Sequence, residues 1–386
     1  FGDQSTMCAG VSYVNAGCLA ASHIVPRSAP GVMKKGLKWM FNSASPLYIK
    51  PRLDLDFLQW TFAFNKSCNA THVNKAIPVI KEISLLSQDL YEEIHKAEGF
   101  KSQYDKKGLL MLCQTEHMLE EEIKLANIAK ENGLDVVELN NDEIKALEPN
   151  VEMNVLGATY FKCDWHSTPS EFMETMKAYL NNNGVVFYTN ENVADLEIKN
   201  KTIKTIKTNK QTLKADEFVL AAGSWTSILS KKIGLKLLLQ AGKGYRINSS
   251  QHTNITILAI FAEAKTAVTP MHGFTRFAGT MEIAGINNNI RKERVEAISD
   301  AVTRYYPEVV LSSEEKSEAT YGLRPLSPDG LPYIGKSSKC DNLTIATGHA
   351  MMGWSMGPAT GKLVSEIISD KKTSLNTGAL SPDRSF

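Results

Sequence analysis

The sequence predicts an α/β fold joined to an α+β region, and the clearest indication is the stretch 321–368. Its apolar run 343–346 has the length and composition of a buried strand. Gly348 follows as a turn residue, and apolar side chains at helical spacing then predict a helix from about 354 to 368. Such a strand, turn and helix N-terminus offers unpaired backbone N–H groups to an electron-rich ligand.

Two further patterns support this fold class. The short apolar run 218–221 ends in the small turn Ala222, Gly223, Ser224 and Trp225, which predicts a second strand–turn–helix unit. Residues 240–285 instead show runs typical of antiparallel strands, and a helix is predicted over 293–306. Helical spacing also predicts helices over 75–98, 116–133 and 169–182, with a strand over 184–189.

Length and composition fit a globular protein of two closely joined domains. The chain has 386 residues, of which 43% are hydrophobic and 22% charged, with a net charge of +1. Nothing in this balance indicates nucleic-acid binding. Six cysteines lie scattered without a C-x-x-C pair, which favours reduced thiols and no metal site. No apolar run is long enough to span a membrane and no secretory signal is visible, so we expect a cytoplasmic protein.

Arg324 is the first candidate functional residue. It lies between Leu323 and Pro325 in a segment punctuated by proline and glycine. A planar guanidinium there is suited to binding a carboxylate through two parallel hydrogen bonds.

Two motifs in this region carry a family resemblance. The segments GLRPLSPDGLPYIG and TGHAMMGWSMGPATG together resemble the FAD-dependent amine and amino-acid oxidoreductases of the D-amino-acid oxidase and glycine oxidase group. Within that group they are most similar to the bacterial D-amino-acid dehydrogenases. The resemblance implies a Rossmann-like FAD-binding domain of the glutathione-reductase type, interleaved with an α+β substrate or cap domain that carries an antiparallel sheet. We assign 1–60, 151–235 and 321–386 to the first domain, and 61–150 and 236–320 to the second.

The beginning of the chain departs from the family pattern. No G-x-G-x-x-G occurs in the sequence, so we expect a copy that lacks the first strand, glycine loop and helix of the cofactor domain. The resemblance makes Asp3 the acid that bonds the adenosine ribose, although a lone acid can equally be structural. Ser12 opens the family's Ser-x-x-Asn-Ala-Gly loop, whose Asn15, Ala16 and Gly17 would pass beside the flavin ring. A plain turn is the alternative for that tripeptide.

The remaining cofactor residues also follow from the resemblance. It places a valine at the position of Val193 against the adenine and the turn at 222–225 under the cofactor. The predicted FAD contacts from these segments and from the C-terminal turn are Val193, Ala222, Gly223, Trp225, Gly348, His349, Gly353, Trp354 and Ser355.

Substrate contacts are predicted at Arg324, as the carboxylate clamp, and at Tyr245 of the Lys-Gly-Tyr motif, as a lining residue. Glycine oxidases tend to carry a second basic residue after the Gly-His turn, where this chain has Met351 and Met352. That difference favours a looser, apolar pocket for larger side chains.

Other polar residues are less persuasive as substrate contacts. For Asp164 and His166, a structural role beside a helix capped by Ser167 or Thr168 before Pro169 is favoured over acid–base catalysis. His272 is expected in an exposed loop. Arg276 is either a second substrate contact or the outer face of a strand.

The predicted function is oxidative deamination of D-amino acids. A hydride passes from Cα to flavin N5, and water hydrolyses the imino acid to a 2-oxo acid and ammonia. The family comparison suggests a quinone as electron acceptor. The basic, Trp-bearing amphipathic stretch 31–41 is a candidate for peripheral contact with the inner face of the cell membrane. The alternatives are a related flavin enzyme acting on glycine, sarcosine, proline or hydroxyproline, or a chain unable to hold FAD.

Overall fold

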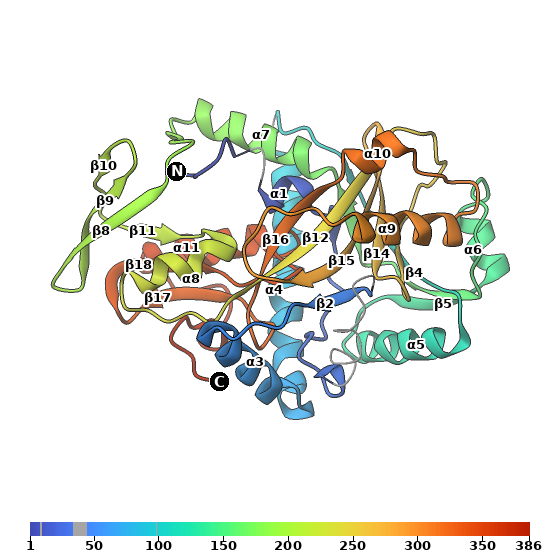
Figure 1. Ribbon diagram of the computed structural model, residues 1–386, viewed down its shortest axis with the longest axis horizontal. Coiled ribbons are helices and arrows are strands. Elements are labelled where there is room, and N and C mark those ends of the chain that lie inside the picture. The colour runs from blue at the N-terminus through green and yellow to red at the C-terminus, as the bar shows by residue number, and fades with distance from the viewer. Residues whose placement is uncertain (8–9, 34–44, 98) are drawn as a thin grey trace.

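The computed structural model describes residues 1–7, 10–33, 45–97 and 99–386. A large sheet and a group of smaller sheets lie side by side, and the long helix α4 (Ala70–Lys96) runs between them (Figure 1). The nine-stranded sheet has the order β16-β12-β15-β14-β13-β4-β6-β5, and β2 also pairs with β15. Its strands are β2 (Leu47–Ile49), β4 (Leu109–Cys113), β5 (Val136–Asn140), β6 (Gly157–Phe161), β12 (Gln240–Ser249), β13 (Leu258–Phe261), β14 (Thr266–Met271), β15 (Phe274–Ile283) and β16 (Thr320–Leu326).

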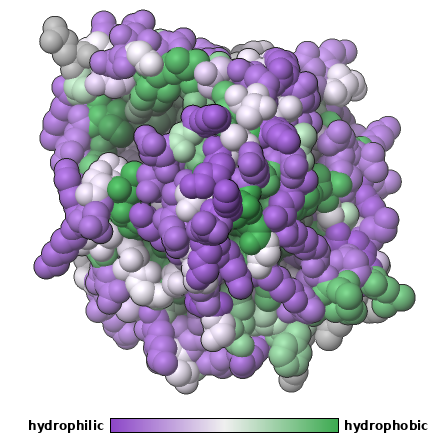
Figure 2. All heavy atoms as spheres, turned by 90° about the vertical axis from the view of Figure 1, so that its left-hand side faces the viewer, coloured by the Kyte–Doolittle hydropathy of each residue, from purple (hydrophilic) through white to green (hydrophobic). Residues whose placement is uncertain are grey.

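The smaller sheets each have three strands. One joins β11 (Phe218–Leu220) in parallel to β18 (Cys340–Thr347), which pairs antiparallel with β17 (Tyr333–Ser337). The second contains β8 (Val193–Lys199), β9 (Thr202–Thr208) and β10 (Thr212–Leu213). The third contains β1 (Cys18–Leu19), β7 (Trp165–Ser167) and β3 (Tyr104–Asp105). Hydrophilic side chains, with hydrophobic patches between them, cover the end of the molecule that faces the viewer in Figure 2.

Several helices begin at a residue whose side chain caps them. Asn69 accepts a hydrogen bond from the His72 amide (2.9 Å) at the start of α4, and Thr115 caps α5 (Glu116–Glu131) in the same way. The others are α1 (Val11–Val14), α3 (Leu55–Ser67), α6 (Asn141–Leu147), α7 (Pro169–Asn182), α8 (Thr226–Lys231), α9 (Lys292–Tyr305), α10 (Ser313–Ser317) and α11 (Gly357–Ile368), with short 3-10 turns η1 (Gly223–Trp225) and η2 (Gly378–Leu380). No helix among the described residues is long and apolar enough to cross a membrane.

The large sheet is covered on both faces, which explains the continuous apolar run of β4. Leu110 and Leu112 pack into the core beneath α9, whereas Leu109 and Met111 pack against Ala126 and other residues on the α5 side. A strand with both faces buried needs no polar alternation. On the other side of the molecule, α4 packs against α11 through a separate apolar cluster.

The predicted helices over 75–98, 116–133, 169–182 and 293–306 are confirmed within a few residues. Three local predictions are wrong. The C-terminal helix, predicted from about 354, begins only at Gly357. The strand over 184–189 is reduced to one bridge between Tyr188 and Gly2.

The third error concerns the helix cap. Thr168 stands at the N-cap of α7, but its hydroxyl bonds Gln103 and the His272 amide instead of capping the helix. The division into two domains stays a prediction. Strands β2, β6 and β16, which the predicted borders assign to the cofactor domain, lie in the nine-stranded sheet. The amphipathic stretch of 31–41 lies mostly outside the described residues.

Candidate active site

Arg324 lies on β16 with its guanidinium packed against the backbone of Gly244 in the neighbouring strand β12. A Cβ built on Gly244 would lie 2.2 Å from Nη2 of Arg324. Nη1 donates to the carbonyl oxygen of Thr280 (3.0 Å). The glycine of the Lys-Gly-Tyr motif is therefore the space that this guanidinium occupies.

A β-bulge in β15 turns the Thr280 carbonyl toward Arg324. Lys243 pairs with Glu282 and Tyr245 with Gly279, so both Thr280 and Met281 stand opposite Gly244. Thr280 has φ 61°, a left-handed conformation that is rare for a β-branched residue. Its Oγ1 is buried without a hydrogen-bond partner among the described residues. Backbone strain of this kind is concentrated at functional sites, where the surrounding structure maintains it.

The charge of Arg324 is not neutralised by the part of the chain that the structure describes. Its side chain is half-buried, and no carboxylate of the described residues lies within ion-pairing distance. Burial, and then the neighbouring charge of Arg27, lower the pKa of Arg324 to about 10, so it remains a cation at neutral pH. An unpaired, partly buried cation is an anion-binding group.

Tyr245 does not lie beside Arg324. Its side chain is 1% exposed and packs in the core beneath α9, on the opposite face of the sheet from Gly244 and Arg324. Its hydroxyl donates to Oε2 of Glu282 (2.8 Å), which also lies 3.6 Å from Nε of Arg291 and of Arg294. The predicted lining role of Tyr245 is thus wrong, because its neighbour Gly244 presents the open face.

The loop at Asn15, Ala16 and Gly17 is a tightly bonded turn after α1. Oδ1 of Asn15 accepts from the Gly17 amide (2.7 Å), and its Nδ2 donates to the carbonyl of Ser12 (2.8 Å). Arg276 is 2% exposed, so it is not the outer face of a strand; its Nη1 donates to the carbonyls of Tyr13 (3.0 Å) and Asn15 (2.7 Å). These bonds leave Arg276 a structural clamp on the loop.

The turn from Gly348 to Ser355 is fastened to the Asn15–Gly17 loop through uncharged groups. Nε1 of Trp354 donates to Oγ of Ser167 (3.0 Å), and the Ser167 amide donates to the carbonyl of Gly17 (3.0 Å). Oγ of Ser355 donates to the carbonyl of Cys18 (3.0 Å) and accepts from the Ala20 amide (3.1 Å). The structure therefore brings these two predicted cofactor segments together, with Gly353 at the exposed tip of the turn.

His349 is a neutral part of the same turn. Its Nε2 lies 2.9 Å from Oγ1 of Thr360, and burial lowers its pKa to about 4. Gly348 has φ 81°, and a Cβ there would lie 2.8 Å from the Tyr333 ring. Both observations indicate a close-packed turn with little room for larger residues.

The turn after β11 joins this arrangement. Oγ1 of Thr347, directly before Gly348, donates to the carbonyl of Gly223 (3.1 Å), and Oγ of Ser224 donates to the carbonyl of Leu323 (3.0 Å). Ala222, Gly223 and Trp225 therefore lie beside the strand that carries Arg324.

Asp3 and Val193 form a second group. Oδ1 of Asp3 accepts from the amide and from Oγ of Ser5, both at 2.7 Å, and its carbonyl accepts from the Glu191 amide (2.9 Å), two residues before Val193. A cavity of about 520 Å³ lies between this group and the turns described above, because Ser5 from this group and Trp225 from the turn after β11 both line it. The remaining lining residues are Gln4, Ile286, Asn287 and Asn288.

Comparison with known proteins establishes the family. A family model described as FAD dependent oxidoreductase matches residues 3–367. The chain belongs to this family. It is 30% identical over 371 residues to a D-amino acid dehydrogenase of Helicobacter pylori, an alignment that covers 95% of this chain and 88% of that protein.

Solved structures share the fold of this chain. A glycine oxidase from Geobacillus kaustophilus has a TM-score of 0.78 at 20% identity and covers 100% of this chain and 91% of its own. An L-proline dehydrogenase from P. horikoshii has a TM-score of 0.68 at 21% identity and covers 78% and 83%. The predicted fold class and the FAD cofactor are confirmed.

The residues of this oxidoreductase fit an FAD that extends between the two groups. The Asn15–Gly17 loop and the turn from Gly348 to Ser355 are held together at one end, and at the other end the cavity is lined by Ser5, two residues from Asp3. Thr280 and Ser167 were not predicted from the sequence as parts of the site. Arg276 was considered as a second substrate contact, but it bonds the carbonyls of Tyr13 and Asn15 instead.

Asp164 and His166 do not form a catalytic pair. Asp164 is fully buried, and its carboxylate accepts from the Ser22 amide (2.9 Å) and from the Ser22 hydroxyl. Burial raises its pKa to about 7. His166 is also fully buried, with Nε2 3.4 Å from Oδ2 of Asp105. His272 is exposed, as predicted, and its Nδ1 contacts Glu171. Asp164 therefore holds the segment that follows Gly17, which is a structural role.

We expect Gly17→Ala to weaken FAD binding and lower thermal stability. The added Cβ would lie 2.2 Å from the carbonyl oxygen of Ser167, and the φ of 71° is itself strained for alanine. Gly133→Ala is the matched control, because Gly133 has φ 79° but no atom within 4 Å of its Cβ position. Bound flavin, measured from its visible absorbance, and the unfolding temperature should fall in Gly17→Ala well beyond the control. Equal losses in both variants would contradict the close contact.

Asp164→Asn should flatten the dependence of stability on pH. The folded-state pKa of about 7 lies above the unfolded value of about 4, so protonated Asp164 stabilises the fold at low pH. That contribution decreases as the pH rises from about 4 and is lost above about 7. Urea unfolding of the two proteins between these pH values should show wild type losing stability relative to Asp164→Asn. Asp135→Asn, at an exposed position, should keep the wild-type slope.

Proposed function

We propose that this oxidoreductase converts D-amino acids to 2-oxo acids and ammonia. The observation that carries the proposal is Arg324, an accessible guanidinium with no carboxylate partner among the described residues, next to the segments that fit FAD. Relatives of this chain in Helicobacter pylori are named D-amino acid dehydrogenase. A substrate carboxylate on Arg324 would neutralise this charge through two charge-assisted hydrogen bonds.

The residues of the chain bind and orient, and FAD, when bound, accepts the hydride from Cα. Arg324 would hold the α-carboxylate, and the Thr280 carbonyl and the Gly244 backbone would keep the guanidinium in one orientation. Asp3 and Val193 would hold the adenosine end of FAD, and the Asn15–Gly17 loop with the turn from Gly348 to Ser355 would hold the flavin end. Loss of the hydride and one amine proton leaves an imino acid, which water hydrolyses to the 2-oxo acid and ammonia.

The alternative is that the same flavin chemistry acts on a related amine substrate. Structural neighbours include a glycine oxidase and an L-proline dehydrogenase, both at or below 21% identity. Glycine, sarcosine, L-proline and hydroxyproline therefore belong in the same substrate panel as the D-amino acids. Bleaching of the flavin absorbance by D-alanine and not by L-alanine would support the proposal. Bleaching by sarcosine or L-proline alone would overturn it.

Arg324→Met should lower kcat/KM for D-alanine by roughly 100- to 1000-fold, because two hydrogen bonds to a charged group contribute about 3–4 kcal/mol. Gly244→Ala should lower it as well, since its Cβ displaces the same guanidinium. Arg304→Met, at an exposed position on α9, is the control. Both site variants should retain bound flavin. Wild-type kcat/KM in Arg324→Met would exclude the carboxylate-binding role.

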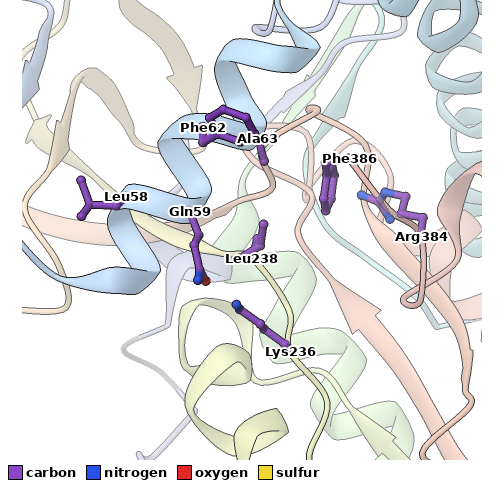
Figure 3. A pocket seen from close by; sticks show the side chains of 8 residues that line it. All are labelled: Leu58, Gln59, Phe62, Ala63, Lys236, Leu238, Arg384 and Phe386. Atoms are coloured by element: carbon purple, nitrogen blue, oxygen red, sulfur yellow. The ribbon is translucent and has the colours of Figure 1, made fainter.

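An exposed apolar ridge supports a membrane quinone as the electron acceptor. The ridge consists of Leu53, Leu55, Leu58 and Phe62, which are between 47% and 97% exposed on α3 and the segment before it. Beside it lies a groove of about 480 Å³, where Gln59 points toward Lys236 and Leu58 points away (Figure 3). Phe62, Ala63, Leu238, Arg384 and Phe386 complete its lining.

Basic side chains border the ridge. Lys66 donates to a main-chain oxygen of Phe386 (2.6 Å), Lys231 contacts Asp56, and Lys236 lines the groove. Exposed leucine and phenylalanine next to lysines are typical of a surface that binds anionic lipids. We include this contact in the proposal, with the quinone dissolved in the bound membrane.

Wild-type protein should float with vesicles that contain phosphatidylglycerol and less so with pure phosphatidylcholine vesicles. Leu55→Ser/Phe62→Ser should reduce binding more than tenfold, because burying each side chain contributes about 2 kcal/mol. Val310→Ser, which changes a residue 61% exposed outside the ridge, should bind like wild type. Equal flotation of all three proteins would exclude the ridge as the membrane contact.

A further inference from the structure

A second guanidinium, that of Arg27, lies on a loop that packs on the segments next to Arg324. Arg27 follows Pro26 in a loop that packs on residues 329 and 330. Oγ of Ser28 donates to the Asp329 carbonyl (2.9 Å), and a Cβ on Gly330 would lie 3.1 Å from Cβ of Pro26. Arg27 thus projects from a backbone that is fixed to the segment following Arg324.

The side chain of Arg27 reaches the turn that sequence reasoning expected to be apolar. Its Nη2 lies 3.6 Å from Sδ of Met351. The amide of the preceding Ala350 donates to the carbonyl of Pro325 (2.9 Å), directly after Arg324. Met352 packs instead against the core between α4 and α11. The charge of Arg27 is near enough to contribute to the lowered pKa of Arg324.

Neither guanidinium forms an ion pair with a carboxylate of the described residues. The contact of Arg27 at Met351 is an uncharged thioether. Loss of solvent around its guanidinium lowers the pKa of Arg27, and the charge of Glu122 raises it in part; the side chain nevertheless remains exposed, so a ligand can reach it. The nearby His23 has its pKa lowered to about 4, by burial first and then by Arg27, and stays neutral. The charges of Arg27 and Arg324 repel each other, and a ligand with two anionic groups would relieve that repulsion.

We propose that Arg27 is a second anion-binding residue of the substrate site and selects D-amino acids whose side chain ends in a carboxylate. The inference rests on the proposed function and deepens it. Arg324 holds the α-carboxylate, and Arg27 holds the side-chain carboxylate of an acidic substrate such as D-glutamate. D-glutamine has the same shape without the charge, so the pair isolates the contribution of Arg27.

The test compares kcat/KM for D-glutamate with that for D-glutamine in wild type, Arg27→Met and Arg304→Met. Wild type should prefer D-glutamate at least tenfold. Arg27→Met should reduce this ratio at least tenfold, whereas Arg304→Met, an exposed arginine of α9, should keep it. Methionine fills most of the volume of arginine without its charge, and the variant's bound flavin and circular dichroism verify that it is folded.

A binding measurement makes the result independent of turnover. Calorimetric titration of the FAD-loaded protein with 2-oxoglutarate and with pyruvate should show tighter binding of the dicarboxylate, and Arg27→Met should lose that difference. Unchanged selectivity in both measurements, with D-alanine still oxidised, would overturn the role of Arg27 and leave the proposed function intact. Failure of every D-amino acid to reduce the wild-type flavin, with 2-oxoglutarate still bound through Arg27, would overturn the proposed function alone. Loss of bound flavin in Arg27→Met would instead assign Arg27 to the cofactor and overturn the inference.

Discussion

The packing of one guanidinium against one glycine determines the geometry of the candidate site. Arg324 can lie over β12 only because residue 244 has no side chain, and it keeps its orientation because a bulge directs the Thr280 carbonyl at it. The bulge places a β-branched residue at φ 61°, which the paired strands on both sides maintain. On the opposite face, Tyr245 and Glu282 are bonded to each other in the core, so the sheet is rigid directly beneath the site.

The segments that fit FAD are joined to one another mainly by hydroxyls, an indole and backbone carbonyls. Ser167, Ser355, Thr347 and Trp354 make these links. Because these linking groups are uncharged, the electrostatic potential at the site is determined by the two arginines and the bound ligand. A carboxylate among the linking groups would compete with a substrate for Arg324. Arg276 is the one charged group among these links, and its guanidinium donates hydrogen bonds to the carbonyls of Tyr13 and Asn15.

The sequence was sufficient for what depends on local pattern. Apolar spacing predicted α4, α5, α7 and α9 closely, and the run 343–346 lies inside the strand β18. The family resemblance predicted that 15–17, 222–225 and 348–355 would serve one site, and the structure brings these segments together. What depends on strand register could not be predicted: Tyr245 and Gly244 differ by one residue, and that one residue decides which faces Arg324. The left-handed conformation of Thr280 has no signature in the sequence. Arg27 and Arg324 are about 300 residues apart in the chain, so no local pattern could relate them.

Three other arginines of the same fold differ from Arg27 and Arg324 in the groups that compensate their charge. Arg384 makes a bidentate pair with Asp329 at 2.8 and 3.0 Å, Arg294 lies 3.6 Å from Glu282, and Arg276 is bonded to two carbonyls and Asn248. These three arginines are therefore compensated where they serve structure, whereas no carboxylate of the described residues pairs with Arg27 or Arg324. We infer that a ligand supplies the missing charges, because unpaired guanidiniums contribute nothing to stability and their repulsion costs free energy. One such charge is common to all amino acids, and the second distinguishes among them.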